Sequence, residues 1–167
     1  MSQDSLSRLL EVLRAEEDLY VRLRDTLQRE HALMASLDAK GLEEVARRKE
    51  ELADEGRLIE ETRLLITREL ARELEMDTET PRLSTLCETL GARGEELRRT
   101  HTRLVVLVGV VRELMDANRA LAGDALAQVR GTLQLLGALV PGEVLYDPAS
   151  RGGSAPLGVG QLVRRTA

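Results

Sequence analysis

The fold is decided by the chain around one short break, residues 27–52, which read LQREHALMASLDAKGLEEVARRKEEL. On both sides of the break at 38–41, apolar side chains recur at alternating spacings of three and four residues, the pattern of a coiled-coil seam. A break this short makes two successive helices antiparallel neighbours. The stretch therefore predicts a long helical hairpin, with one helix over roughly 4–37 and the second over roughly 42–75.

Charged residues interrupt this seam in a matched way. Facing residues of an antiparallel hairpin have a constant index sum, so the pairing of Leu27 with Leu52 determines every other pair. In that register each seam glutamate faces a base, Glu16 facing Arg63 and Glu30 facing Lys49. Such pairs add little net stability, because desolvation offsets their attraction, but a slip by one heptad would place a charge against leucine. We therefore predict that these two ion pairs set the hairpin register; the alternative is coincidence in a charge-rich chain.

A third helix is predicted over roughly 80–139. Thr80 is a good N-cap and Pro81 suits the first helical position, while the Pro-Gly pair at 141–142 stops the pattern. Roughly 60 helical residues at about 1.5 Å each would reach about 90 Å, against about 50 Å for the second helix. Beyond about Glu113 we therefore expect this helix either to project past the hairpin or to bend back as a fourth helix.

The expected fold class is all-α: an antiparallel hairpin and a long third helix that form a three-helix bundle, with a fourth helix if the third is broken. The chain has no Phe and no Trp, so its core must come from repeated aliphatic contacts along helical seams. We assign residues 1–140 to the bundle. The remainder, 141–167, has three prolines and five glycines among few large apolar residues and is predicted to be a flexible tail.

The last part of the third helix differs in composition from the second helix. Only four of the 27 residues from 114 to 140 are charged, against 18 of the 34 from 42 to 75. The segment also carries an apolar stripe, which we predict to be the binding surface for a client helix: Leu114, Met115, Leu121, Leu126, Val129, Leu133 and Leu136. The alternative is that this segment packs back on the hairpin as an ordinary core helix.

Composition argues against several other classes of function. The net charge is −5, from 24 basic and 29 acidic residues that are interleaved, which disfavours nucleic acid as a partner. The single cysteine, Cys87, excludes an intramolecular disulfide and suits a reducing cytoplasm. The first residues lack the pattern of a signal peptide. The longest apolar run, 104–111, is too short to span a bilayer and indicates the centre of the bundle or a dimer contact.

No group of residues indicates catalysis, a metal or a cofactor. The two histidines, His31 and His101, have no His or Cys at ligand spacing, and no glycine-rich loop follows a strand. No nucleophile, base and orienting group can be named together. We therefore expect no enzymatic activity, no metal and no cofactor. The chain is expected to bind another protein, as a monomer or weak dimer and without stable insertion in a membrane.

The order of these motifs resembles the FlgN family of flagellar type III export chaperones. The shared features are a glutamate-bearing first helix, a second helix with spaced bases (Lys49 in ARRKEEL, Arg63 in EETRLL), Asn118 in DANRALAGDAL, and Tyr146 in VLYDPASRGG. The resemblance implies a cytoplasmic chaperone that binds the C-terminal helices of hook–filament junction proteins, prevents their aggregation or premature assembly, and delivers them to the export gate. It further implies that the C-terminal part binds the client and that Tyr146 docks on the gate.

Two other interpretations of the same pattern stay open. One is a chaperone for a different secreted client, such as the filament cap. The other is a structural coiled-coil tether or dimerisation module, which predicts a stable dimer and no client. The end of the hairpin pattern before Pro81 counts against the tether.

Overall fold

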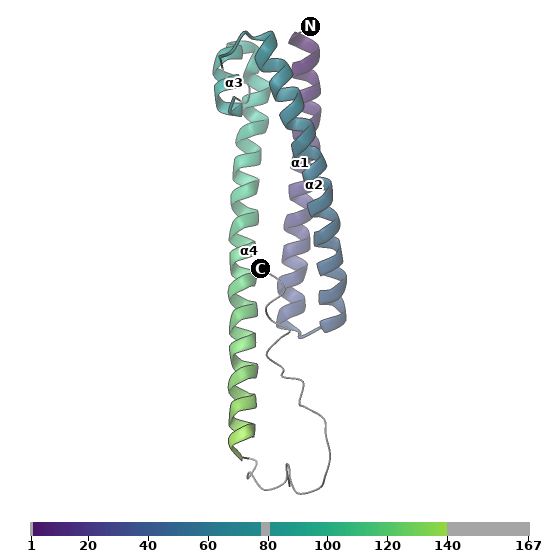
Figure 1. The fold of residues 1–167 in the computed structure, drawn as a ribbon, viewed down its shortest axis with the longest axis vertical. Helices are drawn as coiled ribbons and strands as arrows, with labels where there is room; N and C mark the ends of the chain where they lie inside the picture. The colour runs from purple at the N-terminus through teal and green to yellow at the C-terminus, as the bar shows by residue number, and fades with distance from the viewer. Residues whose placement is uncertain (1, 78–80, 140–167) are drawn as a thin grey trace, which may run out of the picture. The chain divides into compact units, whose positions relative to one another are not determined.

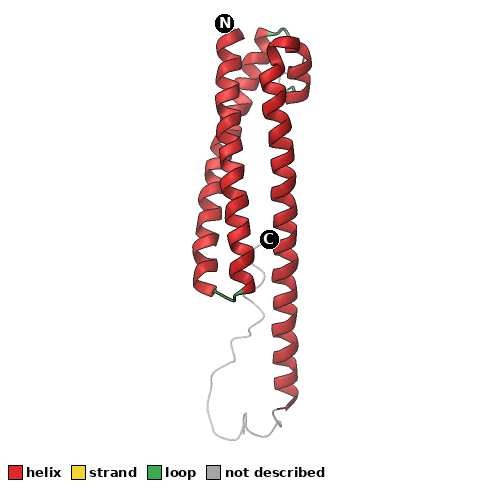
Figure 2. Cartoon of the chain, turned by 180° about the vertical axis from the view of Figure 1, so that it is seen from behind, coloured by secondary structure: helices red, strands yellow, loops and turns green. Residues whose placement is uncertain are grey.

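The computed structural model describes residues 2–77 and 81–139. These residues form helices α1 (Ser2–Ala35), α2 (Ala39–Glu73), α3 (Leu83–Leu90) and α4 (Glu95–Leu139), with a 3-10 turn, η1 (Gly91–Gly94), between the last two. No strand occurs in the described ranges (Figure 2), and the predicted all-α fold class is confirmed. The chain divides into two units, residues 1–128 and 129–167, and the packing contacts below lie within the first.

The first two helices form the predicted hairpin and lie side by side along their lengths (Figure 1). Leu37 was expected in the first helix, but it lies in the turn with a φ of 55° and an 83% exposed side chain. Asp38 caps α2, because its side chain accepts a hydrogen bond from the backbone nitrogen of Gly41 at 3.0 Å. A Cβ at Gly41 would lie 2.6 Å from the end of the Leu33 side chain, so a larger residue here would displace that leucine.

The expectation of one continuous third helix is wrong near its start. The helix α3 ends at Gly91, whose φ of 56° is a conformation that residues with a side chain rarely adopt. A Cβ at Gly94 would lie 2.9 Å from the nearest side-chain atom of α3, so glycine is also needed where η1 leads into α4. The start of α3 lies after a non-helical Pro81, and Thr80, the expected N-cap, lies outside the described residues.

The hydrophobic core is concentrated where α1 begins, α2 ends and α3 closes the hairpin (Figure 1). Its members are aliphatic apart from the thiol of Cys87. Among Phe, Trp and Tyr, the described ranges contain only Tyr20, which packs against this core. They are Leu6, Leu9, Leu10, Leu13, Ile66, Leu70, Leu86, Cys87, Leu90, Leu97 and Leu104. This core anchors the first part of α4 to the hairpin.

Helix α4 runs parallel to α1. Arg103 pairs with Glu17 at 2.9 Å, and further along both helices Asn118 donates a hydrogen bond to the backbone oxygen of Leu27. Because α3 and η1 cover the end of the hairpin, α4 starts at Glu95, about 15 residues later in the sequence than the predicted third helix. The expectation that the hairpin ends near Glu113 is therefore wrong: the hairpin still covers α4 at Asn118, and α4 stays helical through Glu113.

The apolar run 104–111 is covered on one side. Leu104 and Val111 are buried, whereas Val105 and Val106 are 57% and 64% exposed. The run is therefore not enclosed on every side, as the centre of a bundle would be. In the described ranges, none of the helices has the length and apolar content needed to cross a membrane.

Candidate partner-binding site

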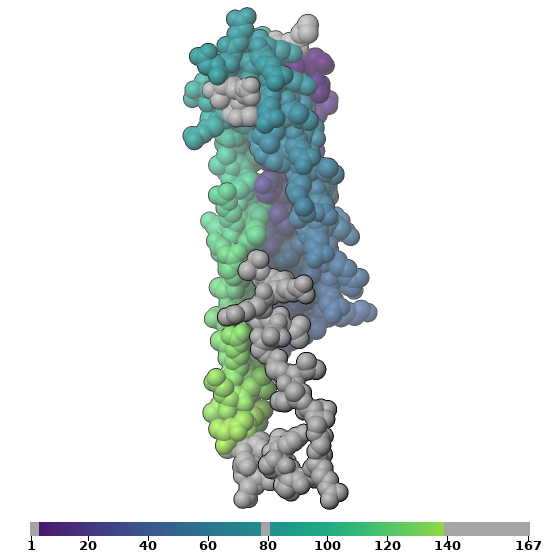
Figure 3. Space-filling view, in the orientation of Figure 1, coloured from purple at the N-terminus to yellow at the C-terminus, as the bar shows by residue number. Residues whose placement is uncertain are grey.

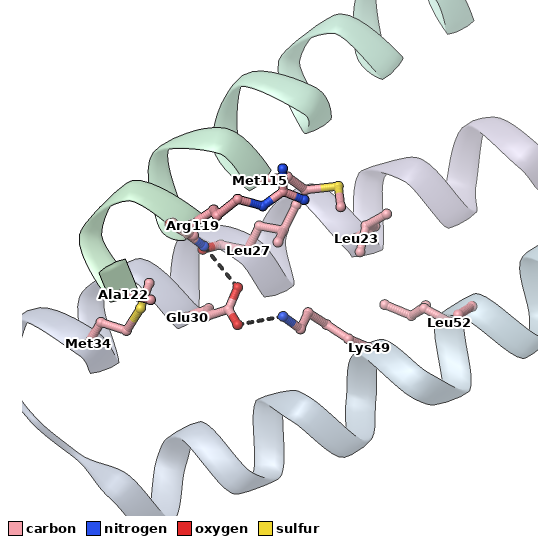
Figure 4. A pocket seen from close by; sticks show the side chains of 11 residues that line it. Leu23, Leu27, Glu30, Met34, Lys49, Leu52, Met115, Arg119 and Ala122 are labelled. Atoms are coloured by element: carbon pink, nitrogen blue, oxygen red, sulfur yellow. Dashed lines mark hydrogen bonds and ion pairs between the residues drawn. The ribbon is translucent and has the colours of Figure 1, made fainter. Parts of the chain in front are cut away.

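A polar network centred on Asn118 joins three helices. The side-chain Nδ2 of Asn118 donates to the backbone oxygen of Leu27 and to Glu30 Oε2, both at 2.9 Å. Glu30 Oε1 accepts from Lys49 Nζ at 2.5 Å, so this carboxylate bridges α2 and α4 (Figure 4). His31 Nδ1 lies 3.0 Å from Asn118 Oδ1. Because Nδ2 already donates twice, Oδ1 is the acceptor and His31 is the donor in this last bond.

This network explains how a polar side chain occupies a seam position. Asn118 is 5% exposed, and a buried amide without partners would cost about 1–3 kcal/mol. Both polar atoms of its side chain are instead bonded, to groups of α1 that also reach α2 through Glu30. The network therefore holds α4 against the hairpin at one level.

The second predicted pair is looser than the first. Arg63 Nε lies 3.6 Å from Glu16 Oε2, whereas the hydrogen bonds of this guanidinium go to Glu60 of the same helix, the shortest at 2.6 Å. Burial raises the pKa of Glu16, and the charge of Arg63 acts in the opposite direction. The structure thus brings each seam glutamate near its expected base, while their role in setting the register stays a prediction.

A hollow of about 460 Å³ opens beside the Asn118 network, between α1, α2 and α4 (Figure 4). Its wall is mainly apolar, made by leucine, methionine and alanine, and methionine adapts its shape to varied partners. The lining residues are Leu23, Leu27, Glu30, Met34, Lys49, Leu52, Ala53, Met115, Asn118, Arg119 and Ala122. A hollow of this size lies in the range of ligand clefts and has room for several side chains of a partner.

The seven residues of the predicted stripe differ in exposure. Leu114 and Leu121 are half-buried, and Met115 lines the hollow. The other four, which we call the exposed row, are all more than half exposed: Leu126, Val129, Leu133 and Leu136. Leu135, outside the predicted stripe, is exposed as well. Large apolar side chains in contact with water at this density are typical of an interaction surface.

Sequence reasoning missed part of this site. Leu23 and Met34 of α1 and Arg119 of α4 line the hollow, but only the packing of three helices places them together. The spacing of Met115, Arg119 and Ala122 along α4 is the one local signal that could have indicated a shared face. Tyr146, the expected gate-docking residue, lies outside the described residues. Within the described ranges no cluster of His, Cys, Asp and Glu is placed to hold a metal ion.

The fold and the site together define an all-helical bundle protein with an apolar hollow between its long helices and apolar side chains exposed along α4. The family described as FlgN protein matches residues 1–151. The chain therefore belongs to the FlgN family, whose members are flagellar export chaperones. No curated protein and no solved structure matches the chain significantly.

Proposed function

We propose that this protein is a cytoplasmic chaperone that binds the C-terminal helices of hook–filament junction proteins, prevents their aggregation or premature assembly, and delivers them to the export gate. Membership of the FlgN family supports the general role. The exposed row of α4 is the observation that carries the proposal. An apolar helix of a client is the natural cover for such a row, as in other helix-in-groove complexes.

The mechanism needs no covalent chemistry. Binding covers the apolar face of the client helix, and the bound form is favoured over aggregation by mass action. Delivery requires release, so the complex must be reversible when the export gate competes for client or chaperone. A moderate affinity serves this purpose better than a very tight one.

The exposed row alone does not supply such an affinity. Burying the exposed half of each of its four side chains contributes about 0.7–1.5 kcal/mol per residue, half of the value for complete burial. The sum, about 3–6 kcal/mol, falls short of the roughly 8 kcal/mol of a micromolar complex, and the loss of rigid-body freedom reduces it further. The client therefore needs contacts in addition to those with the exposed row.

Calorimetry with the full chain and the C-terminal helical fragments of the host's hook–filament junction proteins tests client binding. Val129→Asp combined with Leu136→Asp places two charges in the exposed row. The matched control, Leu58→Asp with Leu65→Asp, makes the same change at two exposed leucines of α2 with the same spacing. We expect the row variant to bind about tenfold or more weakly, because desolvating a carboxylate is costly, and the control to bind normally.

Two outcomes would count against this proposal in different ways. If the wild type, the row variant and the control all bind equally, the client contacts another surface. If the wild type binds none of the fragments, the assignment of these clients is wrong. Circular dichroism shows whether each variant keeps the helical fold.

Delivery to the gate is a separate step with its own variant. Tyr146→Ala is expected to leave client binding unchanged but to reduce the amount of client exported, because aromatic side chains are common anchors at interfaces. Client secreted into the culture medium is the quantity to measure. Export at the wild-type level would remove Tyr146 from the docking step.

A further inference from the structure

The first unit has a groove along the side between α2 and α4. The hollow beside Asn118 is continued by one of about 640 Å³ between α1 and α2, and then by one of about 340 Å³ that α4 also lines. The first and second hollows share Ala53, and the second and third share Glu16 and Arg63. They form one groove with α1 as floor and α2 as one wall, and α4 lines the first and third hollows as the other wall. Figure 3 shows α1 at the bottom of a recess between these two helices.

The two walls of the groove differ in free charge. On the α4 wall, Arg112 forms no ion pair with any described residue, and Arg119 reaches Asp116 only at 3.8 Å with both side chains largely in water. On the α2 wall, Lys49 and Arg63 are each hydrogen-bonded to a glutamate of the bundle. The α2 side also carries Arg57, which pairs with Asp54, and the acids Glu60 and Glu61. The groove therefore presents weakly compensated positive charge along α4 and mixed charge along α2.

The groove also contains residue types that dominate binding at protein interfaces. Tyr20 is half-buried and lines the central hollow, while Met34 and Met115 line one end. Burial is the main cause of the raised pKa of Tyr20, the charges of Glu16 and Glu60 add to it, and those of Arg112 and Arg63 act in the opposite direction. Tyrosine and arginine are enriched among the residues that carry most of the binding energy at interfaces.

We propose that this groove receives an amphipathic client helix whose apolar face is flanked, on the side towards α4, by two carboxylates one heptad apart. Arg112 and Arg119 are separated by seven residues, about 10 Å along α4, so Asp or Glu at positions i and i+7 of the client meets both. From His101 to Ala122 the α4 wall extends for about 30 Å, the length of a helix of about 20 residues. The client helix then packs against α1, α2 and α4 as the fourth helix of a bundle.

This inference rests on the proposed function and adds the chemistry that selects the client. An apolar groove binds many amphipathic helices with similar strength. Paired bases on one wall favour helices with carboxylates at the matching positions and disfavour those with bases there. They also fix the orientation of the bound helix, since its acidic edge must face α4.

The first test is charge reversal in the groove, with the same client fragments as probes. Arg112→Glu combined with Arg119→Glu reverses the α4 wall. Arg47→Glu with Arg68→Glu makes an equal change of net charge at exposed bases of α2 that line none of the three hollows. We expect the groove variant to bind about tenfold or more weakly at low salt and the control to stay within about twofold of the wild type. Added salt should weaken the wild type more than the groove variant.

A second variant blocks the groove without changing its charge. Ala53 is exposed and lies where the first two hollows meet, so Ala53→Trp fills the groove at that point. Ala15→Trp adds the same bulk at an exposed position of α1 away from the groove. We expect the Ala53 variant to lose about tenfold or more in affinity and the Ala15 variant to bind normally. Thermal melting shows that each protein remains folded.

The outcomes separate this inference from the proposed function. Loss of binding in both groove variants, with both controls intact, supports the inference. If the wild type binds a fragment and either groove variant binds as well as its control, the groove proposal is overturned and the chaperone stands. If the wild type binds no fragment, both fail together. If sedimentation shows a wild-type dimer that Ala53→Trp abolishes, a second copy of the chain occupies the groove and the client proposal is overturned.

Discussion

At the residue scale, Asn118 connects the three long helices of the first unit. It bonds directly to α1 and reaches α2 through the Glu30–Lys49 pair. Beyond Leu104, the buried side chains of α4 among residues 105–128 are Val111 and Asn118 alone, so this amide supplies a large part of the contact between α4 and the hairpin in that stretch.

Removing this amide should therefore destabilise the fold measurably. Asn118→Ala eliminates three hydrogen bonds at a buried position, and we expect the free energy of unfolding to fall by about 1–3 kcal/mol. His31→Ala removes only the bond at the exposed edge of the network and should cost less than about 1 kcal/mol. Urea denaturation at constant m value measures both changes. Equal losses in the two variants would mean that the buried part of the network contributes nothing of its own.

At the scale of elements, we predict that the hairpin register depends on where charges meet across its seam. The pair Glu30–Lys49 is tightly bonded, while Glu16 and Arg63 are 3.6 Å apart and Arg63 also bonds to Glu60. Both glutamates lie mostly out of water. A charge placed against leucine after a slip by one heptad would have neither water nor a partner, so we predict that these levels resist a shift of one helix along the other.

Exchanging the looser pair tests this role. Glu16→Arg alone brings two mostly buried bases together and should cost about 3 kcal/mol or more. In the double exchange, Glu16→Arg with Arg63→Glu, about half of that loss should be recovered, because opposite charges meet again although the new carboxylate lies beside Glu60. A double-mutant cycle from urea denaturation measures the coupling. Losses that simply add would show that the two residues do not interact.

At the scale of the whole molecule, the uneven distribution of the core leaves a surface open for a partner. Leucines of all four helices are packed where α3 closes the hairpin, and the core is thin along the rest of the first unit. Where the core is thin, the groove between α2 and α4 stays open, with weakly compensated bases on its α4 wall. On the proposed function, a client helix bound in this groove would leave the main core covered.

The sequence by itself determined the two helices of the hairpin, the helical character of the segment that follows and the apolar stripe, but not the break of that segment into α3 and α4. Heptad spacing and a short polar break act between residues that are near in the chain or face each other across one turn. The resemblance to the FlgN family, carried by the same motifs, is confirmed by the family match. The assignments of residues 140–167 fall outside the described residues and stay predictions.

Only the tertiary structure decided how α4 meets the hairpin. The turn at Gly91 and Gly94 places the start of α4 at Glu95. As a result Asn118 lies against the hairpin and is buried, instead of lying beyond the end of the hairpin. The bond between Asn118 and His31 joins residues 87 positions apart, and no local period encodes a contact of that range. The groove has the same origin, because its walls come from helices that are adjacent only after α3 has closed the bundle.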